Sequence, residues 1–232
     1  MRALAIDTST EVLALSAVNG PATFSLALRK GLQHSPALAP LMQRLLSEIG
    51  LSVRDLQLIV CSIGPGSFTG IRIGLATAMG ISFATGCPMV GISTLDMLAS
   101  PHENHDGDVF AVIDARKGNI YTAAFRAGRR RGDYLDIPPR ELREKLAAAE
   151  RPFLAGPDAG KIRDLLLAVP APGGKEAEGR LSPDALPFSC LLDPLALLRL
   201  GEAKFARHGA DTEEGLRPLY LRKSEAEIAG GL

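Results

Sequence analysis

The sequence lacks an excess of charge of either sign. Its 232 residues contain 26 Lys and Arg and 26 Asp and Glu, so the formal net charge at pH 7 is zero. A dedicated nucleic-acid or membrane-surface protein is expected to carry a basic excess, so the neutral balance disfavours direct nucleic-acid binding by the isolated chain. With 46% hydrophobic residues the chain can bury a sizeable core. A neutral chain with apolar helical faces is expected to meet another protein.

Cysteine is scarce, and no C-x-x-C pair occurs. Cys61, Cys87 and Cys190 are widely spaced, and the first two lie in apolar runs typical of buried small residues. This usage predicts a cytoplasmic chain with reduced thiols. The sequence starts directly with a predicted strand and shows no secretory signal. The apolar segment at 70–84 contains an arginine and is expected to be too short and too rich in small residues to span a membrane.

Several catalytic motifs are also missing. No Gly-Lys-Ser/Thr follows the glycine loop at 64–70, so this loop is not a Walker loop. No His-Glu-x-x-His occurs, and no serine lies in a Gly-x-Ser-x-Gly elbow, which argues against a zinc protease and a serine hydrolase. His102 and His105 lie in a polar loop without a third ligand, so the prediction is that the chain has no metal site.

The rest of the chain is organised around the segment from Ile59 to Gly80. An apolar strand is followed by a glycine loop and then by a helix rich in small residues. Such a loop can bind phosphate at a helix N-terminus, but its glycine spacing misses G-x-G-x-x-G by one residue. Helix packing is the favoured interpretation, because Gly70, Gly74 and Ala78 recur every four residues and form a ridge that lets another backbone come close.

The order of predicted elements repeats. Strands at 3–7, 12–18 and 23–28 precede a helix at 36–49, a strand at 58–62 and a helix at 71–85, and a similar order restarts at 109–114. Each half opens with a strand that ends in an acid. The repeat predicts an α/β fold of two βββαβα-type actin-like (ASKHA, RNase H-like) halves, 1–100 and 101–232. The second half is expected to be smaller, with an irregular connection at 170–187 and a final helix at 193–208.

The two acids at these strand ends are weak candidates for a Mg-nucleotide site. In actin-like ATPases the loops after these two strands hold phosphate and magnesium. The corresponding residues here are Asp7, Thr8 and Ser9 in the first half and Asp114 in the second half. Arg116, however, stands where the second loop would need a glycine. The favoured interpretation is that both aspartates cap turns and that no cofactor is bound.

Six segments together resemble the TsaB (YeaZ) family of the glycoprotease-like, TsaD-related superfamily. They are AIDTST at 5–10, HSPALAPLM at 34–42, SIGPGSFTGIRIGLA at 62–76, GISTLDMLA at 91–99, DARKGNIY at 114–121 and RPLYLR at 217–222. The resemblance covers almost the whole chain in order. It implies a cytoplasmic accessory subunit for N6-threonylcarbamoyladenosine (t6A) formation in tRNAs that read codons starting with A. It also implies a heterodimer with the transferase TsaD, which the ATPase TsaE joins, with tRNA bound only through the complex and a homodimer when the chain is alone.

The resemblance also implies that the transfer chemistry is absent. The catalytic relative TsaD has two metal-binding histidines in a motif like G-V-N-H-L-E-G-H, which aligns here with residues 91–98. Thr94 and Leu98 occupy the histidine places, and neither can hold a transition metal alone. The chain is therefore expected not to be an enzyme. The alternative left open is a stand-alone actin-like nucleotide-hydrolysing or glycoprotease-like enzyme.

The resemblance places the TsaD interface on the helices at 36–49 and 70–84. The glycine ridge is expected to allow close approach, so a bulky residue at Gly74 should weaken the heterodimer and leave the fold intact. Leu41, Leu45, Ile71 and Leu75 are expected to be its apolar contacts. The full set of expected interface residues is His34, Leu41, Leu45, Gly66, Ser67, Phe68, Thr69, Gly70, Ile71, Arg72, Gly74, Leu75 and Ala78.

A basic cluster lies in the second half. Arg126 and the run Arg129–Arg131 surround a predicted turn. The cluster could touch a tRNA backbone within an assembled complex. The favoured interpretation is a solvated turn that is balanced by Asp133 and Asp136.

Overall fold

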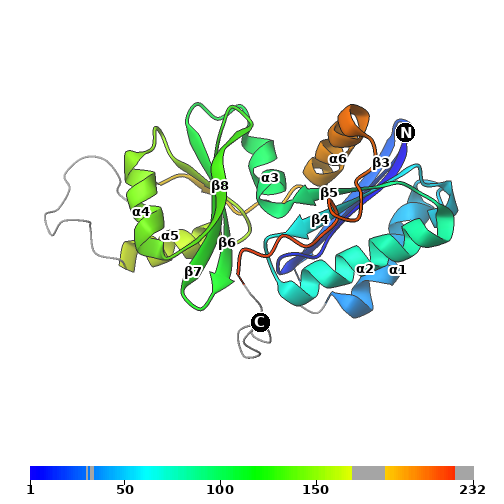
Figure 1. Cartoon of the computed structure of the whole chain (residues 1–232), viewed down its shortest axis with the longest axis horizontal. Coiled ribbons are helices and arrows are strands. Elements are labelled where there is room, and N and C mark those ends of the chain that lie inside the picture. Colours follow the sequence, from blue (N-terminus) through cyan, green and yellow to red (C-terminus); the bar gives the residue numbers. More distant parts are fainter. Residues whose placement is uncertain (30, 32–33, 169–185, 223–232) are drawn as a thin grey trace, which may run out of the picture. The chain divides into compact units, whose positions relative to one another are not determined.

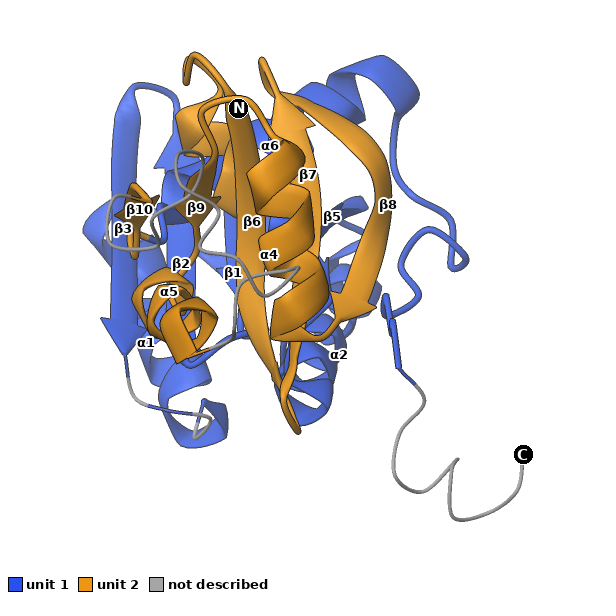
Figure 2. Ribbon diagram, turned by 90° about the vertical axis from the view of Figure 1, so that its left-hand side faces the viewer, with its two compact units in different colours: residues 1–97, 192–232 blue, residues 98–191 orange. Residues whose placement is uncertain are grey.

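A computed structural model describes residues 1–29, 31, 34–168 and 186–222. The chain forms two compact units, which Figures 1 and 2 show. Unit 1 comprises residues 1–97 and 192–232, and unit 2 comprises residues 98–191. Each unit contains one five-stranded sheet, which confirms the predicted α/β class with two similar halves.

The sheet of unit 1 has the order β3-β2-β1-β4-β5. A tight turn at Gly20 and Pro21 joins the antiparallel strands β2 and β3, while β4 pairs in parallel with both β1 and β5. The parallel pairs require a crossover connection, which a helix supplies between β4 and β5. The bounds are β1 Arg2–Asp7, β2 Val12–Asn19, β3 Ala22–Arg29, β4 Leu58–Gly64 and β5 Met89–Ser93.

Helices cover both faces of this sheet. Helices α1 (Ser35–Glu48) and α2 (Phe68–Thr85) share one core with the large side chains of β1 and β2, such as Leu4 and Leu13. Helix α6 (Pro194–His208) packs on the other face, as Figure 1 shows. Successive residues of a strand point to opposite faces of the sheet. In β1 and β2 the residues that alternate with the large ones are small, such as Ala3, Ala5 and Ala14, and they let α6 come close.

Unit 2 repeats the topology of unit 1. Its sheet has the order β10-β9-β6-β7-β8, with β6 to β8 antiparallel and β9 parallel to β6. Helices α4 (Pro139–Ala148) and α5 (Ala159–Ala168) bury Leu142 and Ile162 against one face. The bounds of the strands are β6 Asp108–Arg116, β7 Asn119–Arg126, β8 Arg129–Ile137, β9 Phe153–Ala155 and β10 Phe188–Ser189. The short helix α3 (Thr94–Ala99) and the 3-10 turns Val53–Asp55 and Ser100–His102 complete the described elements.

Three expectations differ from this structure. The final helix was expected in the half 101–232, but α6 completes unit 1, because it covers the second face of that sheet. The arginine cluster was expected around a solvated turn, and Ala127 and Gly128 do form a turn there, but Arg129, Arg130 and Arg131 already lie in β8. The two-residue strand β10 was not predicted. Most of the predicted 170–187 connection lies outside the described residues.

Candidate partner-binding surface and a closed acidic centre

Asp7 lies fully buried at the end of β1, and its own chain surrounds it. Its Oδ1 atom accepts hydrogen bonds from the Ser9 amide at 2.9 Å, the Ser9 hydroxyl at 2.6 Å and the Ser62 hydroxyl at 2.5 Å. Thr94, at one of the places aligned with the TsaD histidines, donates to the Ser9 hydroxyl at 3.0 Å. Asp7 Oδ2 has no hydrogen-bond partner within the described residues. One carboxylate oxygen is thus saturated and the other is buried without a donor.

Burial raises the pKa of Asp7 above its ordinary value of 3.8, although the hydrogen bonds from Ser62 and Ser9 oppose this shift. A folded-state pKa above the unfolded value means that the native state binds the proton more tightly. Stability is then greatest below the unfolded pKa and is lost as the pH rises through the folded pKa.

We therefore expect Asp7→Asn to gain stability relative to wild type as the pH rises from about 4 to about 7. The amide keeps an oxygen for the Ser9 and Ser62 donors and carries no charge to desolvate. Urea unfolding of both proteins across this range measures the difference, and the other titrating groups cancel. A difference in unfolding free energy that does not change with pH would contradict the raised pKa.

The glycine loop and the start of α2 pack directly on this acidic centre. The Ser67 amide donates to the Ser9 carbonyl at 2.7 Å, and the Thr8 hydroxyl donates to the Gly70 carbonyl at 2.7 Å. A Cβ atom at Gly66 would overlap the Ser9 carbonyl oxygen, and one at Gly70 would overlap the Thr8 carbonyl oxygen. The loop, for which phosphate binding was the less favoured interpretation, is therefore occupied by contacts within the chain.

The small-residue ridge consequently faces inward. A Cβ atom at Gly74 would lie 2.5 Å from Thr8 Oγ1 and 3.5 Å from Cys61 Sγ, and Ala78 is fully buried. The expectation that this ridge meets another protein needs correction, because the sheet of unit 1 already covers it.

Most of the expected interface side chains also point into the core. Leu45, Ile71 and Leu75 are buried in the core of unit 1, and Leu41 is partly buried against it. The His34 ring nitrogen Nε2 lies 2.7 Å from the Thr10 carbonyl oxygen, and the ring is fully buried. His34 therefore braces the start of α1 against the turn after β1. Of the expected set, Thr69 and Arg72 are exposed, and Leu41, Gly66, Ser67 and Phe68 are partly exposed.

The solvent-facing side of α2 is formed by other residues. Phe83 is 95% exposed and Met79 is 46% exposed, with Ala76 exposed one turn before them. These positions follow helical spacing on the side opposite Gly74 and Ala78. Arg72 is the only charged residue in the helix. By length and composition alone α2 could cross a membrane, with a mean hydropathy of 1.2 over 18 residues and 28% of that window buried. The expectation that this segment is too short therefore does not hold.

An aromatic cluster fixes the first turn of α2 to the C-terminal segment. The rings of Phe68 and Tyr220 stack with centroids 4.8 Å apart, and the Arg72 guanidinium lies 3.7 Å from the Phe68 centroid. Arg72 Nε donates to the Tyr220 hydroxyl at 3.0 Å, and the Leu219 amide donates to the Ile63 carbonyl at 2.7 Å. The RPLYLR segment therefore packs beside the loop that precedes α2.

Asp114, the acid at the end of the first strand of unit 2, is also satisfied by its own chain. Lys161 Nζ donates to Asp114 Oδ2 at 2.6 Å, and the Arg116 amide donates to Oδ1 at 2.8 Å. Although partial burial opposes it, these donors lower the pKa of Asp114 below its ordinary value. A lysine ammonium thus neutralises the second of the two acids considered for a Mg-nucleotide site.

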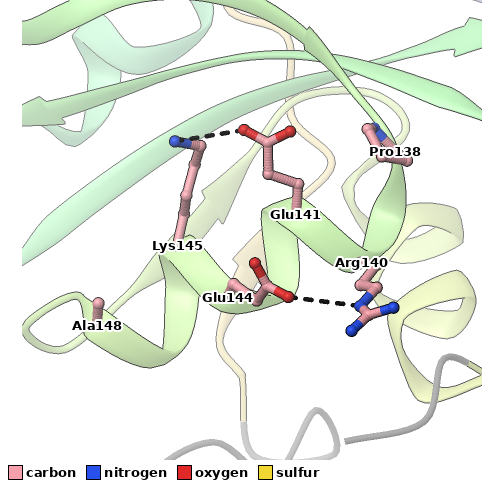
Figure 3. Close-up of a pocket in the computed structure, with 6 residues that line it drawn as sticks. All are labelled: Pro138, Arg140, Glu141, Glu144, Lys145 and Ala148. Carbon is pink, nitrogen blue, oxygen red and sulfur yellow. Dashed lines mark ion pairs between the residues drawn. The ribbon is translucent and has the colours of Figure 1, made fainter. Parts of the chain in front are cut away.

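Two further features are a pair of histidines and a hollow over α4. His102 and His105 both pack against Phe153, with ring centroids 4.7 and 5.2 Å away, and within the described residues no group of three His, Cys, Asp or Glu could hold a metal. An open hollow of about 660 Å³ lies over α4 (Figure 3). Its charged residues form ion pairs along the helix, Arg140 with Glu144 and Lys145 with Glu141.

Comparison with known proteins places this geometry in a family. A family model described as "TsaD: tRNA N6-adenosine threonylcarbamoyltransferase" matches residues 30–165. The Escherichia coli protein named "tRNA threonylcarbamoyladenosine biosynthesis protein TsaB" is 30% identical over 97% of this chain and 96% of its own length. The Bacillus subtilis protein of the same name is 30% identical over 98% and 96%. The chain belongs to the TsaB family.

Solved structures agree with this assignment. A Pseudomonas aeruginosa protein described as similar to "peptidase YEAZ" has a TM-score of 0.76 and 29% identity, with 95% of this chain and 99% of that chain covered. A second Pseudomonas aeruginosa structure, "YeaZ", has a TM-score of 0.71 and 27% identity over the same shares. Two of the family motifs quoted above have a clear place in the structure. The GPGSFTGIRIG segment packs on the turn after Asp7. The RPLYLR segment contacts Phe68 through Tyr220.

Sequence reasoning missed Met79, Phe83 and the contact of Tyr220 as features of this surface. The signal for the first two was present, because α2 is apolar on every side and a helix with a solvent face normally carries more than one charge. No local signal pointed to Tyr220, which lies far along the chain from its partners.

Proposed function

We propose that this chain is a non-catalytic accessory subunit required for t6A formation in tRNAs that read codons starting with A. It binds and supports the transferase TsaD through the exposed side of α2, with α1 alongside, and TsaE joins this complex. The protein works in the cytoplasm and forms a homodimer through the same surface when TsaD is absent.

The bare apolar side of α2 carries this proposal. A phenylalanine that is 95% exposed, beside an exposed methionine and alanine, is the kind of aromatic anchor that dominates protein interfaces. A protein is a better occupant than a lipid bilayer, because α2 joins the adjacent parallel strands β4 and β5 and buries Ile71 and Leu75 in the core. A helix held in this way can present only one side.

The acidic centre supports the non-catalytic part of the proposal. Asp7 is buried, its Oδ1 atom accepts three hydrogen bonds, and the start of α2 covers the turn beyond it. Asp114 is paired with Lys161. Both acids that a phosphate and magnesium site would need are engaged by protein groups.

We expect Phe83→Asp to weaken TsaD binding at least about 30-fold, because truncating an aromatic anchor removes roughly 2 kcal/mol. The melting temperature should stay within about 2 °C, since Phe83 makes almost no contact within the chain. Leu167→Asp is the matched control, because it places the same charge on an α5 position that is 42% exposed. Calorimetric titration against purified TsaD measures all three proteins. Equal affinities of wild type and Phe83→Asp would contradict the proposed surface.

The functional test is threonylcarbamoyl transfer to tRNA by TsaD and TsaE with a threonylcarbamoyl-adenylate supply enzyme. Transfer should require this chain and should fall with Phe83→Asp but not with Leu167→Asp. Nucleotide turnover by the isolated chain, or a higher melting temperature with Mg-nucleotide, would instead favour the stand-alone enzyme.

A further inference from the structure

The hairpin formed by β7 and β8 concentrates positive charge in a chain that is neutral as a whole. Residues 126–131 of the hairpin include four arginines and no aspartate or glutamate, and Asp133 and Asp136 follow farther along β8. Ala127 and Gly128, with φ of 48° and 71°, form the two-residue turn, so that Arg126 pairs across it with Arg129. Strand β8 is an edge strand of unit 2 (Figure 2). The arginines therefore lie along an open sheet edge.

The arginines of this hairpin differ in whether an acid engages them. Arg126 is partly buried and forms ion pairs with Glu150 and, at 3.6 Å, with Asp108. Arg129 and Arg131 are exposed, and no ion pair between described residues involves either of them. They lie on the same side of β8, about 7 Å apart, as alternate residues of a strand do. This separation is close to that of successive phosphates along a nucleic-acid strand.

Arg130 points to the opposite side and forms a flat, charged platform. Its guanidinium lies 4.1 Å from the centroid of the Tyr134 ring, and Nη1 donates to the Gly132 carbonyl. An arginine held over an aromatic ring loses little freedom when it contacts a phosphate or stacks on an unpaired base. The hairpin thus presents two exposed cations on one side of β8 and an arginine stacked on an aromatic ring on the other side.

We propose that the Arg129–Tyr134 segment of this hairpin binds the phosphate backbone of tRNA. The inference rests on the proposed function, which brings tRNA to the complex, and assigns a direct contact to this chain. RNA fits better than an acidic protein, because none of the large exposed apolar side chains in the described chain lies in this segment. A protein interface would be expected to include such an anchor.

The test compares two double variants of the full chain. Arg129→Gln with Arg131→Gln removes two unpaired cations from the hairpin. Arg140→Gln with Lys145→Gln removes two cations from α4, where both are paired with glutamates of the same helix (Figure 3). Fluorescence anisotropy with labelled tRNA is measured between 50 and 200 mM salt, the range over which phosphate contacts change affinity most clearly.

The hairpin variant should bind tRNA about tenfold more weakly at low salt, and the slope of log affinity against log salt should become shallower by roughly 1.5, as expected for two lost phosphate contacts. The α4 variant should stay within about twofold of wild type, because its cations are already neutralised. Equal losses in both variants, or no measurable affinity of the wild-type chain at 50 mM salt, would overturn the inference.

A second readout separates this inference from the proposed function. The hairpin variant should bind TsaD as wild type does, whereas Phe83→Asp should lose TsaD and keep its affinity for tRNA. If Phe83→Asp leaves TsaD binding intact while the hairpin variant loses tRNA, the α2 surface is wrong and the RNA contact stands. If the hairpin variant keeps full tRNA affinity, the arginines serve only to prevent pairing at the sheet edge.

Discussion

Replacing Gly70 with alanine is expected to lower the free energy of unfolding by about 3 kcal/mol or more, or to prevent folding. The new methyl group would lie closer to the Thr8 carbonyl oxygen than the 3.0 Å that real Cβ atoms keep from a neighbour. That oxygen belongs to the backbone of the turn after Asp7, so it cannot rotate away. The turn would have to move, and the hydrogen bond from the Thr8 hydroxyl to the Gly70 carbonyl would be lost. Urea unfolding followed by circular dichroism measures the effect.

Gly80→Ala is the control for this prediction. Gly80 lies in the same helix and is exposed, and an added Cβ would meet no atom within 4 Å. This variant should gain about 0.5–1 kcal/mol, because alanine loses less backbone entropy than glycine in a helix. If both variants change stability alike, then the close packing of α2 on the Thr8 turn is wrong.

The packing of α2 on the Thr8 turn also makes Gly74 unsuitable as a test of the partner surface. A bulky residue at Gly74 was expected to weaken TsaD binding without harming the fold. Its Cβ atom would lie 2.5 Å from Thr8 Oγ1, so the substitution disturbs the core before any partner is met. Phe83 is the cleaner position, because its side chain projects into solvent and its loss should leave the packing of unit 1 unchanged.

The sequence predicted the two-half architecture because that signal is local. Apolar runs of strand length, glycines and prolines at turns, and helical periodicity are each read within a short window, and their repeated order indicates two similar sheets. The direction of the small-residue ridge was not predictable in this way. Gly70 and Gly74 allow close approach by any backbone, and periodicity does not say whether the sheet of the same chain or another protein supplies it.

Two other differences between the predicted and the observed structure concern the arginines of β8 and the place of α6. Arg129, Arg130 and Arg131 lack the alternation of a half-buried strand, because they lie on an edge strand where both sides are open to solvent, so their place in β8 was not predicted. Helix α6 was predicted to belong to the second half because it follows that half in the sequence. Its actual contact with β4 joins residues about 140 positions apart, and no local pattern carries that information.

We expect Gly201→Ala to destabilise the protein by about 2 kcal/mol, although alanine is the better helix former. Gly201 lies where α6 crosses β4, and its added Cβ would lie 2.8 Å from the Val60 Cβ atom and overlap both Val60 methyl groups. Val60 is fully buried, and its branched side chain has little rotational freedom. The helix would have to move away from the sheet, which makes this substitution a probe of whether α6 belongs to unit 1. Urea unfolding at constant pH measures the loss.

A double-mutant cycle with Val60→Ala makes this prediction specific. Val60→Ala alone leaves a cavity beside Gly201 and should also destabilise, but together the two changes exchange volume across one contact. The double variant should therefore be more stable than the sum of the single effects by about 1–2 kcal/mol. Additive effects would mean that Gly201 and Val60 do not touch, and that the C-terminal helix packs elsewhere. A favourable coupling would show that α6 covers the sheet of unit 1, although α6 follows the whole of unit 2 in the sequence.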